Sequence, residues 1–246
     1  MRLTRVHVDS KLIAGKGVGL SEQAGLHLTR VLRLDAGAPL TLFDGTGGEY
    51  SGILERDGKK VWARVGEHDP VERESRLDIT LLQGVARGER MDLIVQKATE
   101  LGVSRIVTVL AERSVVKVDA KQRERKREHW QAVAIAACEQ SGRNRVPDVS
   151  EPMPLAEACD ALPADVLRCL LAVDGAGALA AIARDAAARP MALLIGPEGG
   201  LADNERKFAA ANGFVACRMG PRVMRTETAG LAALTVLQSI AGDFAA

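Results

Sequence analysis

The sequence predicts an α/β protein with a mainly parallel sheet, preceded by a small β-rich domain. From residue 77 onward, short apolar runs alternate with helical stretches, which is typical of a parallel sheet joined by crossover helices. Residues 40–65 instead alternate apolar and polar side chains around glycine turns. The stretch between them, residues 67–76, is polar, charged and broken by Pro70. We therefore expect one domain over residues 1–72 and a second over 73–246.

The small domain contains one clear helical stretch, residues 21–34, with Ser21 as its expected N-cap. His27, Arg30 and Arg33 follow one another at about three-residue spacing, which places them near one another on a helix. The hairpin turns are expected at Asp44-Gly45, Gly47-Gly48 and Asp57-Gly58. A basic helix edge beside a β-barrel would suit RNA phosphates.

Strands and helices take turns in the large domain. Gly102 and Gly213 each end a helical pattern and are expected as C-cap glycines. Ligands bind such sheets at the carboxyl ends of the strands, where residues 196–200 and 219–220 fall. The expected elements, in chain order, cover residues 77–85, 91–102, 104–110, 127–142, 165–173, 191–196, 204–213, 214–220 and 228–242.

Two loops at these strand ends indicate a ligand site. The first, "LLIGPEGGLADNE" over residues 193–205, has glycines that let a backbone approach a ligand, but Glu198 and the lack of a Gly-Lys-Ser/Thr ending argue against a polyphosphate. The second, "MGPRVMRTETAG" over 219–230, feeds the last helix. Thr226 suits an N-cap and Glu227 a first helical turn, whereas Arg222 and Arg225 exceed what capping requires.

Composition excludes several classes of protein. With 47% apolar and 26% charged residues, the chain is of ordinary globular composition, and it shows neither a signal peptide nor a membrane span, so we expect a cytoplasmic protein. Cys138, Cys159, Cys169 and Cys217 lie far apart, which favours buried free thiols over a disulfide framework or a zinc site. The net charge is only +1, but residues 1–40 and 113–145 are locally basic. For residues 121–128, a solvated helix face is the alternative to an RNA contact.

Five stretches together resemble the RsmE family of S-adenosylmethionine-dependent methyltransferases, which act on N3 of a uridine in 16S ribosomal RNA and belong to the SPOUT, or trefoil-knot, superfamily. They are "QKATELGV" at 96–103, "RSVVK" at 113–117, "EQSGR" at 139–143, "IGPEGG" at 195–200 and "MGPRVMRTETA" at 219–229. The match runs in order over the whole chain and includes residues 27–34 and 42–50. Ala202 departs from the family, which usually has a serine cap there, and Asp203 is the expected substitute.

The resemblance implies an N-terminal PUA-like barrel that helps to bind RNA, a knotted methyltransferase domain and a homodimer, with the last helix (residues 229–242) at the dimer contact. No metal is implied. Cofactor binding is expected from Leu194, Ile195, Gly196, Pro197, Glu198, Gly199, Gly200, Met219, Gly220, Val223, Met224, Thr228 and Ala229. RNA phosphates are expected at Arg5, His27, Arg30, Arg33, Lys121, Arg123 and Arg127.

The chemistry predicts a small catalytic set. Methyl transfer to uridine N3 requires that N3 lose its proton and that the resulting anion be stabilised. An arginine can stabilise this anion by donating hydrogen bonds to a ring carbonyl oxygen. We expect Arg225 and Arg143 in this role, with Arg143 supplied either by the same chain or across the dimer, and Glu139 as the candidate base. An ion pair at a helix end is the alternative for Arg143 and Glu139.

Two other enzyme classes lack their sequence signatures in this chain. A dehydrogenase lacks its early glycine fingerprint here, and a hydrolase lacks Gly-x-Ser-x-Gly and a matching histidine arrangement. A non-catalytic RNA-binding protein, or a SPOUT enzyme acting on another RNA, are the remaining alternatives. The first would leave both glycine loops without a role, and the chain's few aromatic residues do not favour a stacking platform.

Overall fold

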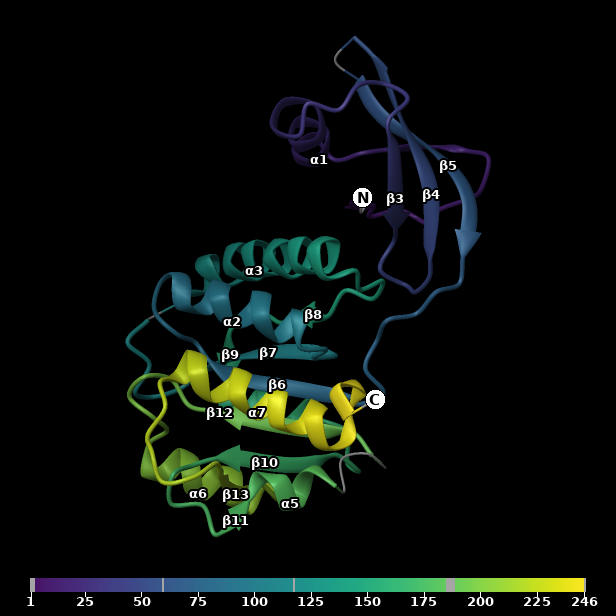
Figure 1. Cartoon of the computed structure of the whole chain (residues 1–246). Helices are drawn as coiled ribbons and strands as arrows, with labels where there is room; N and C mark the ends of the chain where they lie inside the picture. Colours follow the sequence, from purple (N-terminus) through teal and green to yellow (C-terminus); the bar gives the residue numbers. More distant parts are fainter. Residues whose placement is uncertain (1–2, 59, 117, 185–188, 246) are drawn as a thin grey trace. The chain divides into compact units, whose positions relative to one another are not determined.

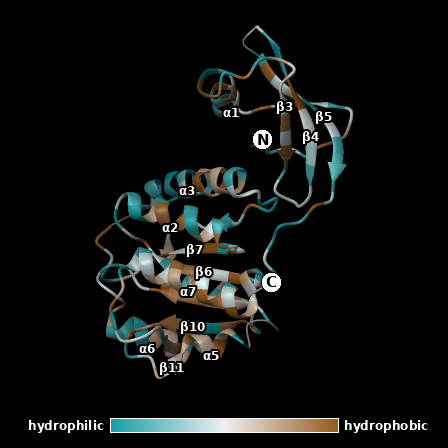
Figure 2. Cartoon of the chain, viewed as in Figure 1, coloured by the Kyte–Doolittle hydropathy of each residue, from teal (hydrophilic) through white to brown (hydrophobic). Residues whose placement is uncertain are grey.

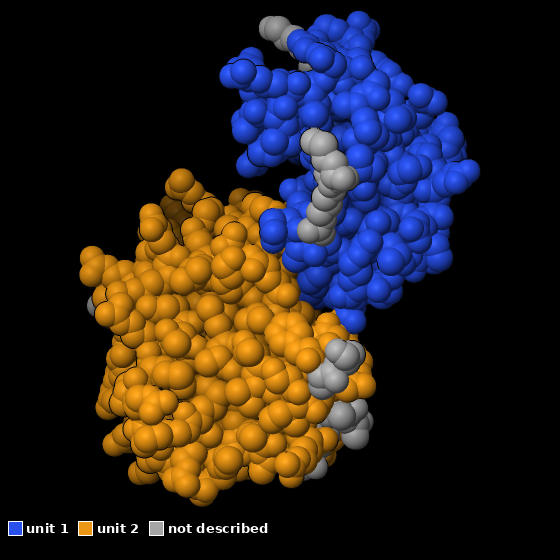
Figure 3. Space-filling view, in the orientation of Figure 1, with its two compact units in different colours: residues 1–74, 138–146 blue, residues 75–137, 147–246 orange. Residues whose placement is uncertain are grey.

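The computed structural model describes residues 3–58, 60–116, 118–184 and 189–245. The chain divides into two compact units (Figure 3). Unit 1 comprises residues 1–74 and 138–146, and unit 2 comprises 75–137 and 147–246. The first boundary lies two residues beyond the expected one. The assignment of residues 138–146 to unit 1 had no counterpart in the sequence pattern.

Unit 1 is built on a five-stranded sheet in the order β1-β3-β4-β5-β2 (Figure 1). β1 is parallel to β3, and the other neighbours are antiparallel. The expected glycine turns join β3 to β4 and β4 to β5, where Gly45, Gly47, Gly48 and Gly58 adopt positive φ angles. The strands are β1 (Thr4–His7), β2 (Gly17–Gly19), β3 (Pro39–Phe43), β4 (Glu49–Asp57) and β5 (Lys60–Asp69).

The predicted helix of unit 1 is confirmed, with one irregularity. α1 (Glu22–Leu26) begins where expected, because Ser21 Oγ accepts a hydrogen bond of 3.1 Å from the backbone N–H of Ala24. It continues as a π-helical turn, η1 (His27–Val31). Leu28 points from η1 into the core of the unit, which it shares with Val6, Leu40, Leu42, Leu54 and Val65.

Residues 138–146 join unit 1 through hydrogen bonds and one buried ion pair, which connect to a charged network around Glu49. Arg5 pairs with Glu49 and donates a hydrogen bond of 3.1 Å to the carbonyl of Arg143. Arg73 donates to Glu49 at 2.7 Å, and Arg143 donates from Nε to Glu74 at 2.9 Å. These bonds link charged groups from distant parts of the chain. They explain why this segment belongs to unit 1, although its first residues are the end of a helix (Ala120–Ser141) that lies mostly in unit 2.

Unit 2 holds an eight-stranded sheet in which every pair is parallel, as predicted. Its order is β11-β13-β10-β12-β6-β7-β8, and β9 also pairs with β7. The strands are β6 (Ile79–Gly84), β7 (Arg105–Leu110), β8 (Asp148–Val149), β9 (Met153–Pro154), β10 (Leu167–Leu171), β11 (Gly177–Ala178), β12 (Met191–Ile195) and β13 (Val215–Arg218).

Helices pack on the sheet of unit 2, and Figure 1 shows α7 lying over β6 and β12. α7 also packs against α2 and α5, while α4 packs against α6. Figure 2 shows apolar residues concentrated on the central strands and a hydrophilic first half of α3. The helices are α2 (Glu89–Glu100), α3 (Ala120–Ser141), α4 (Leu155–Asp160), α5 (Leu179–Ala183), α6 (Asp203–Ala211) and α7 (Thr226–Ala241), followed by a short 3-10 turn, η3 (Asp243–Ala245).

The ends of the helices confirm one capping prediction and correct another. Gly102 and Gly213 adopt φ angles of +80° and +81°, as C-cap glycines require. Asp203 does not cap α6, because it is the first helical residue. Glu205 instead accepts a hydrogen bond of 2.8 Å from the N–H of Ala202 and another of 2.8 Å from the N–H of Glu112.

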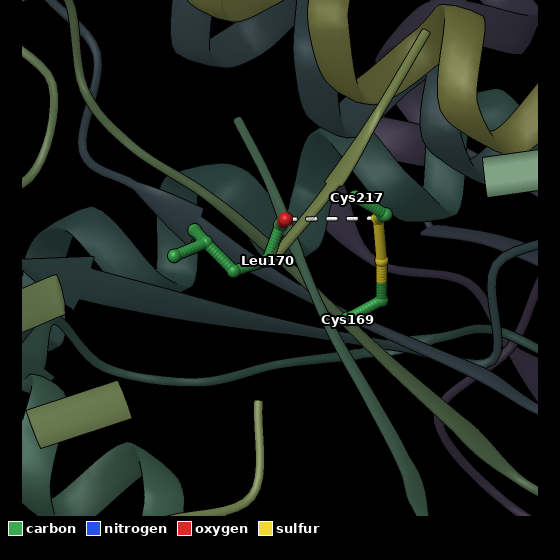
Figure 4. Close-up of a disulfide and its surroundings, with 3 residues drawn as sticks. All are labelled: Cys169, Leu170 and Cys217. Atoms are coloured by element: carbon green, nitrogen blue, oxygen red, sulfur yellow. Dashed lines mark hydrogen bonds between the residues drawn. A yellow bond between two sulfur atoms is a disulfide. The ribbon is translucent and has the colours of Figure 1, made fainter. Parts of the chain in front are cut away.

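The expectation of four free thiols is wrong for two of them. Cys169 of β10 and Cys217 of β13 form a disulfide, drawn in Figure 4, although they are 48 residues apart in sequence. The two strands are neighbours, and the Cα atoms of the two cysteines lie 6.4 Å apart. The parallel pairing of β10 with β13 brings the two sulfur atoms together. A single sequence does not reveal which strands become neighbours. Cys138 and Cys159 are free and buried, as expected.

Candidate active site

The loops that follow β10, β12 and β13 open onto one cavity in unit 2. Its volume is about 1010 Å³. This convergence follows from the topology, because the carboxyl ends of parallel strands meet at the same edge of a sheet. The lining residues are Arg90, Arg113, Leu170, Leu171, Ala172, Val173, Asp174, Ile195, Gly196, Pro197, Glu198, Gly200, Leu201, Arg206, Val223, Met224, Arg225, Thr226 and Ala229.

Thr226 ties the two predicted ligand loops together. Its Oγ1 donates a hydrogen bond of 2.7 Å to the carbonyl of Gly196 and accepts one of 2.9 Å from Nε2 of the buried Gln83. Thr226 was expected to cap α7, but it is the first helical residue, and Arg225 occupies the N-cap position. The hydroxyl therefore fixes the start of α7 against the loop after β12.

Glycines allow close backbone contacts around the loop 196–200. A Cβ atom on Gly84 would lie 2.4 Å from the backbone nitrogen of Pro197. A Cβ atom on Gly199 would lie 2.7 Å from the carbonyl oxygen of Arg113. Both distances are too short for any other residue, so this loop is held tightly between the ends of β6 and β7.

Glu198 braces the same loop. Its Oε1 accepts a hydrogen bond of 3.0 Å from the N–H of Arg87 and another of 3.0 Å from the guanidinium of Arg90. Burial by itself would raise the pKa of this carboxyl, but the hydrogen bonds and the nearby charge of Arg90 outweigh it and lower the pKa. Glu198 is therefore an anion near neutral pH, paired at the edge of the cavity.

Most of the predicted cofactor residues line the cavity, although their role in binding stays a prediction. Ile195, Gly196, Pro197, Glu198, Gly200, Val223, Met224 and Ala229 do so. Leu194, Gly199, Met219, Gly220 and Thr228 do not. The end of β10 and the loop after it, with Leu170 to Asp174, also line the cavity, as do three arginines that the sequence did not indicate: Arg90, Arg113 and Arg206. The strand-end rule could have indicated the β10 loop, because β10 was predicted as a strand of the same parallel sheet.

The predicted catalytic residues fall into both units. Arg225 lines the cavity of unit 2. Arg143 belongs to unit 1, where its guanidinium is buried and paired with Glu74. Glu139, also of unit 1, accepts a hydrogen bond of 3.0 Å from the N–H of His7, and burial raises the pKa of its carboxyl. These contacts match the ion-pair alternative for Arg143, and the catalytic roles of Arg143 and Glu139 stay predictions.

The predicted RNA contacts need one correction. Arg5 is only 8% exposed and its guanidinium pairs with Glu49, so it is part of the interior of unit 1 rather than a surface cation. His27, Arg30 and Arg33 are exposed on and just after η1. Lys121 and Arg127 are exposed on α3, whereas Arg123 is half-buried. Arg33 also has a φ angle of +53°, which is uncommon for a residue other than glycine.

The described part of the chain shows neither a metal-binding cluster nor a membrane-spanning helix. No cluster of three or more histidine, cysteine, aspartate or glutamate side chains there could hold a metal ion. Among the helices that the structure describes, none has the length and apolar character needed to cross a bilayer.

Known protein families match both parts of the chain. A family described as the RNA methyltransferase domain matches residues 73–238, and one described as the RNA methyltransferase PUA domain matches residues 20–65. The ribosomal RNA small subunit methyltransferase E of Bacillus subtilis is 32% identical over 219 residues, which cover 86% of this chain and 85% of that protein.

Solved structures show the same similarity. A protein of Legionella pneumophila, described as a methyltransferase and determined with bound cofactor SAM, is 38% identical, with a TM-score of 0.91 over 99% of this chain and 100% of that one. A ribosomal RNA small subunit methyltransferase E of Neisseria gonorrhoeae, bound to S-adenosyl methionine, is 36% identical, with a TM-score of 0.90 over the same shares. The fold class expected from the sequence is thereby confirmed, whereas the knot itself stays a prediction.

Proposed function

The chain belongs to the RNA methyltransferase family that includes the ribosomal RNA small subunit methyltransferases E, and we propose that it transfers a methyl group from S-adenosylmethionine to N3 of a uridine in 16S ribosomal RNA. The observation that supports this most directly is the hydrogen bond between Thr226 and Gly196. It joins two loops, distant in sequence, into the wall of one cavity.

The cavity suits a nucleoside cofactor. Its volume, about 1010 Å³, is ample for a ligand of that size. The backbone of residues 196–200 is held in place where side chains on Gly84 or Gly199 would collide with neighbouring backbone. Bound S-adenosylmethionine supplies a methyl group activated by a sulfonium. Residues 195–200 and 223–226 would hold it through backbone groups, and the carboxylate of Glu198 adds a negative charge to the wall of the cavity.

The residues of this chain must then orient the uracil and stabilise the anion left when N3 loses its proton. Arg225 lines the cavity, stays charged at any physiological pH, and has forked donors that suit a ring carbonyl oxygen. Its backbone is fixed, because its carbonyl accepts hydrogen bonds of 2.9 Å and 2.8 Å from the N–H groups of Thr228 and Ala229. A fixed backbone limits how far the guanidinium can stray from a productive position.

RNA binding, dimerisation and location belong to the same proposal. The exposed cations of η1 and α3 would bind RNA phosphates. A homodimer through α7 would use the side that faces away from the sheet, where Thr235 and Ser239 are exposed and Leu231 and Val236 are half-buried. A monomeric mass in sedimentation at micromolar concentration would contradict the dimer. Since its proposed substrate is ribosomal RNA, the protein would act in the cytoplasm.

The proposal is tested in two steps. Calorimetry should first show one S-adenosylmethionine bound per chain. Purified protein, S-adenosylmethionine with a labelled methyl group, and either unmethylated small subunits or free 16S rRNA should then yield N3-methyluridine, identified by mass spectrometry of the nucleosides. Absence of cofactor binding would favour the non-catalytic RNA-binding alternative, and label in another nucleoside or another RNA would favour a different substrate.

A further inference from the structure

The cavity contains more arginine than its carboxylates neutralise. Arg90 donates to Glu198 at 3.0 Å, and Arg206 donates to both carboxylate oxygens of Asp174, at 2.7 and 2.8 Å. Arg113 and Arg225 also line the cavity, but neither guanidinium has a hydrogen-bond or ion-pair partner among the residues that the structure describes. Two unpaired cations beside a site for a cationic cofactor call for an anionic second ligand.

Arg113 is held in place through its backbone. It lies in a tight turn after β7, in which the N–H of Ser114 donates to the carbonyl of Ala111 at 3.0 Å. Glu205, at the start of α6, anchors the same turn through its 2.8 Å bond with the N–H of Glu112. The contact with Gly199 fixes the turn against the cofactor loop. The guanidinium of Arg113 thus extends from a fixed point at the edge of the cavity.

The position of Arg113 in the chain indicates which anion it meets. Residues 111–119 lead directly from β7 into α3, whose first turns carry the exposed Lys121, Arg125 and Arg127. Among the described cations of this segment, Arg113 is the one that lines the cavity. An RNA backbone bound along the start of α3 would have a phosphate within its reach where the target nucleotide enters.

We propose that Arg113 binds a backbone phosphate of the target nucleotide and so positions the uracil beside Arg225. This rests on the proposed function and adds a residue to it. The two arginines would have different roles. Arg113 would bind the phosphate, which is charged throughout the reaction, and Arg225 would stabilise the negative charge that develops on the uracil ring. Because a phosphate is bound equally well before and during methyl transfer, Arg113 should affect RNA binding more than the limiting rate.

Single-turnover methylation of 16S rRNA or small subunits, at saturating S-adenosylmethionine and varied RNA concentration, tests the proposal. Arg113→Ala should raise the half-saturating RNA concentration by about tenfold, with the limiting rate changed by less than about threefold. The slope of log affinity against log salt should fall by about one. Arg113→Lys, which keeps the charge, should recover most of the binding. The matched control is Arg184→Ala, an exposed arginine at the end of α5.

Three results would overturn the assignment. An unchanged RNA dependence in Arg113→Ala would show that the guanidinium does not contact the substrate. Weaker S-adenosylmethionine binding by calorimetry would show that it binds the cofactor's carboxylate instead. A lowered thermal midpoint with equal losses in both alanine and lysine variants would show a structural role. If the unmutated protein methylates neither RNA, the proposed function itself fails. If the unmutated protein and Arg113→Ala both methylate RNA with the same RNA dependence, only this inference fails.

Discussion

Arg225 carries the most direct chemical prediction at the scale of single residues. Arg225→Ala should lower the single-turnover rate by about 10²–10³-fold, as the loss of a group that stabilises an oxyanion does elsewhere. The deficit should shrink at high pH, where uridine N3 loses its proton unaided. S-adenosylmethionine affinity should change little. Arg143→Ala should be measured in parallel, because it distinguishes the roles of the two arginines. If this variant loses activity only in proportion to its loss of stability, the role of Arg143 is its structural ion pair with Glu74.

Gly199 tests the packing of the cofactor loop. In Gly199→Val, the new Cβ atom would meet the Arg113 carbonyl at 2.7 Å, so the loop or the turn after β7 must move. We expect S-adenosylmethionine affinity to fall by at least about tenfold, which corresponds to about 1.4 kcal/mol. The global fold should survive, because Gly199 and Arg113 are themselves exposed. Gly19→Val is the control, since a Cβ atom there meets nothing within 4 Å. Normal affinity in Gly199→Val would remove this loop from the binding site.

Glu49 links the stability of unit 1 to pH. Burial alone would raise the pKa of its carboxyl, but Arg73 and Arg5 lower it to about 2. Because the folded-state pKa lies below the ordinary value of 4.5, the contribution to stability is fully present above pH 4.5 and is lost as the pH falls toward 2. Glu49→Gln should therefore lower the free energy of unfolding by about 3 kcal/mol at pH 7 and by much less at pH 3.

Tryptophan fluorescence can follow this loss in unit 1 alone. The chain has two tryptophans, Trp62 in unit 1 and Trp130 in unit 2. In a Trp130→Phe background, urea unfolding reports on the surroundings of Trp62. An equal effect of Glu49→Gln at pH 7 and pH 3 would be inconsistent with the lowered pKa.

At the scale of elements, the start of α7 depends on one hydroxyl. Thr226→Val keeps the shape of the side chain but removes the bonds to Gly196 and Gln83. The free energy of unfolding should fall by about 1–3 kcal/mol, because the Gly196 carbonyl and the Gln83 amide each lose a hydrogen-bond partner. Cofactor affinity should fall as well, since two cavity loops are released from each other. Thr235→Val is the matched control: its hydroxyl is exposed and bonds only to Leu231 of the same helix. Equal melting temperatures for the two variants would contradict this role.

Long, patterned elements were predictable from sequence, and short ones were not. The segments that form β6, β7 and β12 are apolar runs of five or six residues, and α7 has a long helical pattern. β8, β9 and β11 have two residues each, and α4 and α5 have six and five, so they offer no period to detect. Their existence depends on neighbours that only the fold provides. The disulfide between Cys169 and Cys217 belongs to the same class, since it depends on which strands become adjacent.

The candidate site was predictable where its residues lie in glycine motifs. Residues 195–200 and 223–225 could be selected because glycines and arginines at a strand end have few structural explanations. Asp174 and Arg113 could not, because an exposed charged residue in a loop is common, and Arg206 could not, because a charged residue on a helix is equally common. Arg5 was misassigned for a related reason: a sequence shows the charge of an arginine but not the buried glutamate that neutralises it.

At the scale of the whole molecule, RNA affinity should depend strongly on salt. The double variant Lys121→Ala/Arg127→Ala removes two exposed cations of α3 and should lower the slope of log affinity against log salt by about two. Sequence preference should not change, because phosphate contacts carry none. Arg184→Ala/Arg189→Ala removes the same charge elsewhere and should leave the slope unchanged. Filter binding over a range of potassium chloride concentrations measures both, and equal slopes would indicate that α3 is a solvated face.

The division of unit 1 into residues 1–74 and 138–146 has a consequence for biosynthesis. When the first segment leaves the ribosome, Arg5 and Glu74 still lack the partners that the later segment supplies. The complete unit can form only after residue 146 has been translated, and we expect the first segment to be more open to proteases until then. For the same reason, residues 1–74 expressed alone should fold poorly. A gene that fuses residues 138–146 behind residue 74 through a flexible linker is the better starting point for an isolated RNA-binding module.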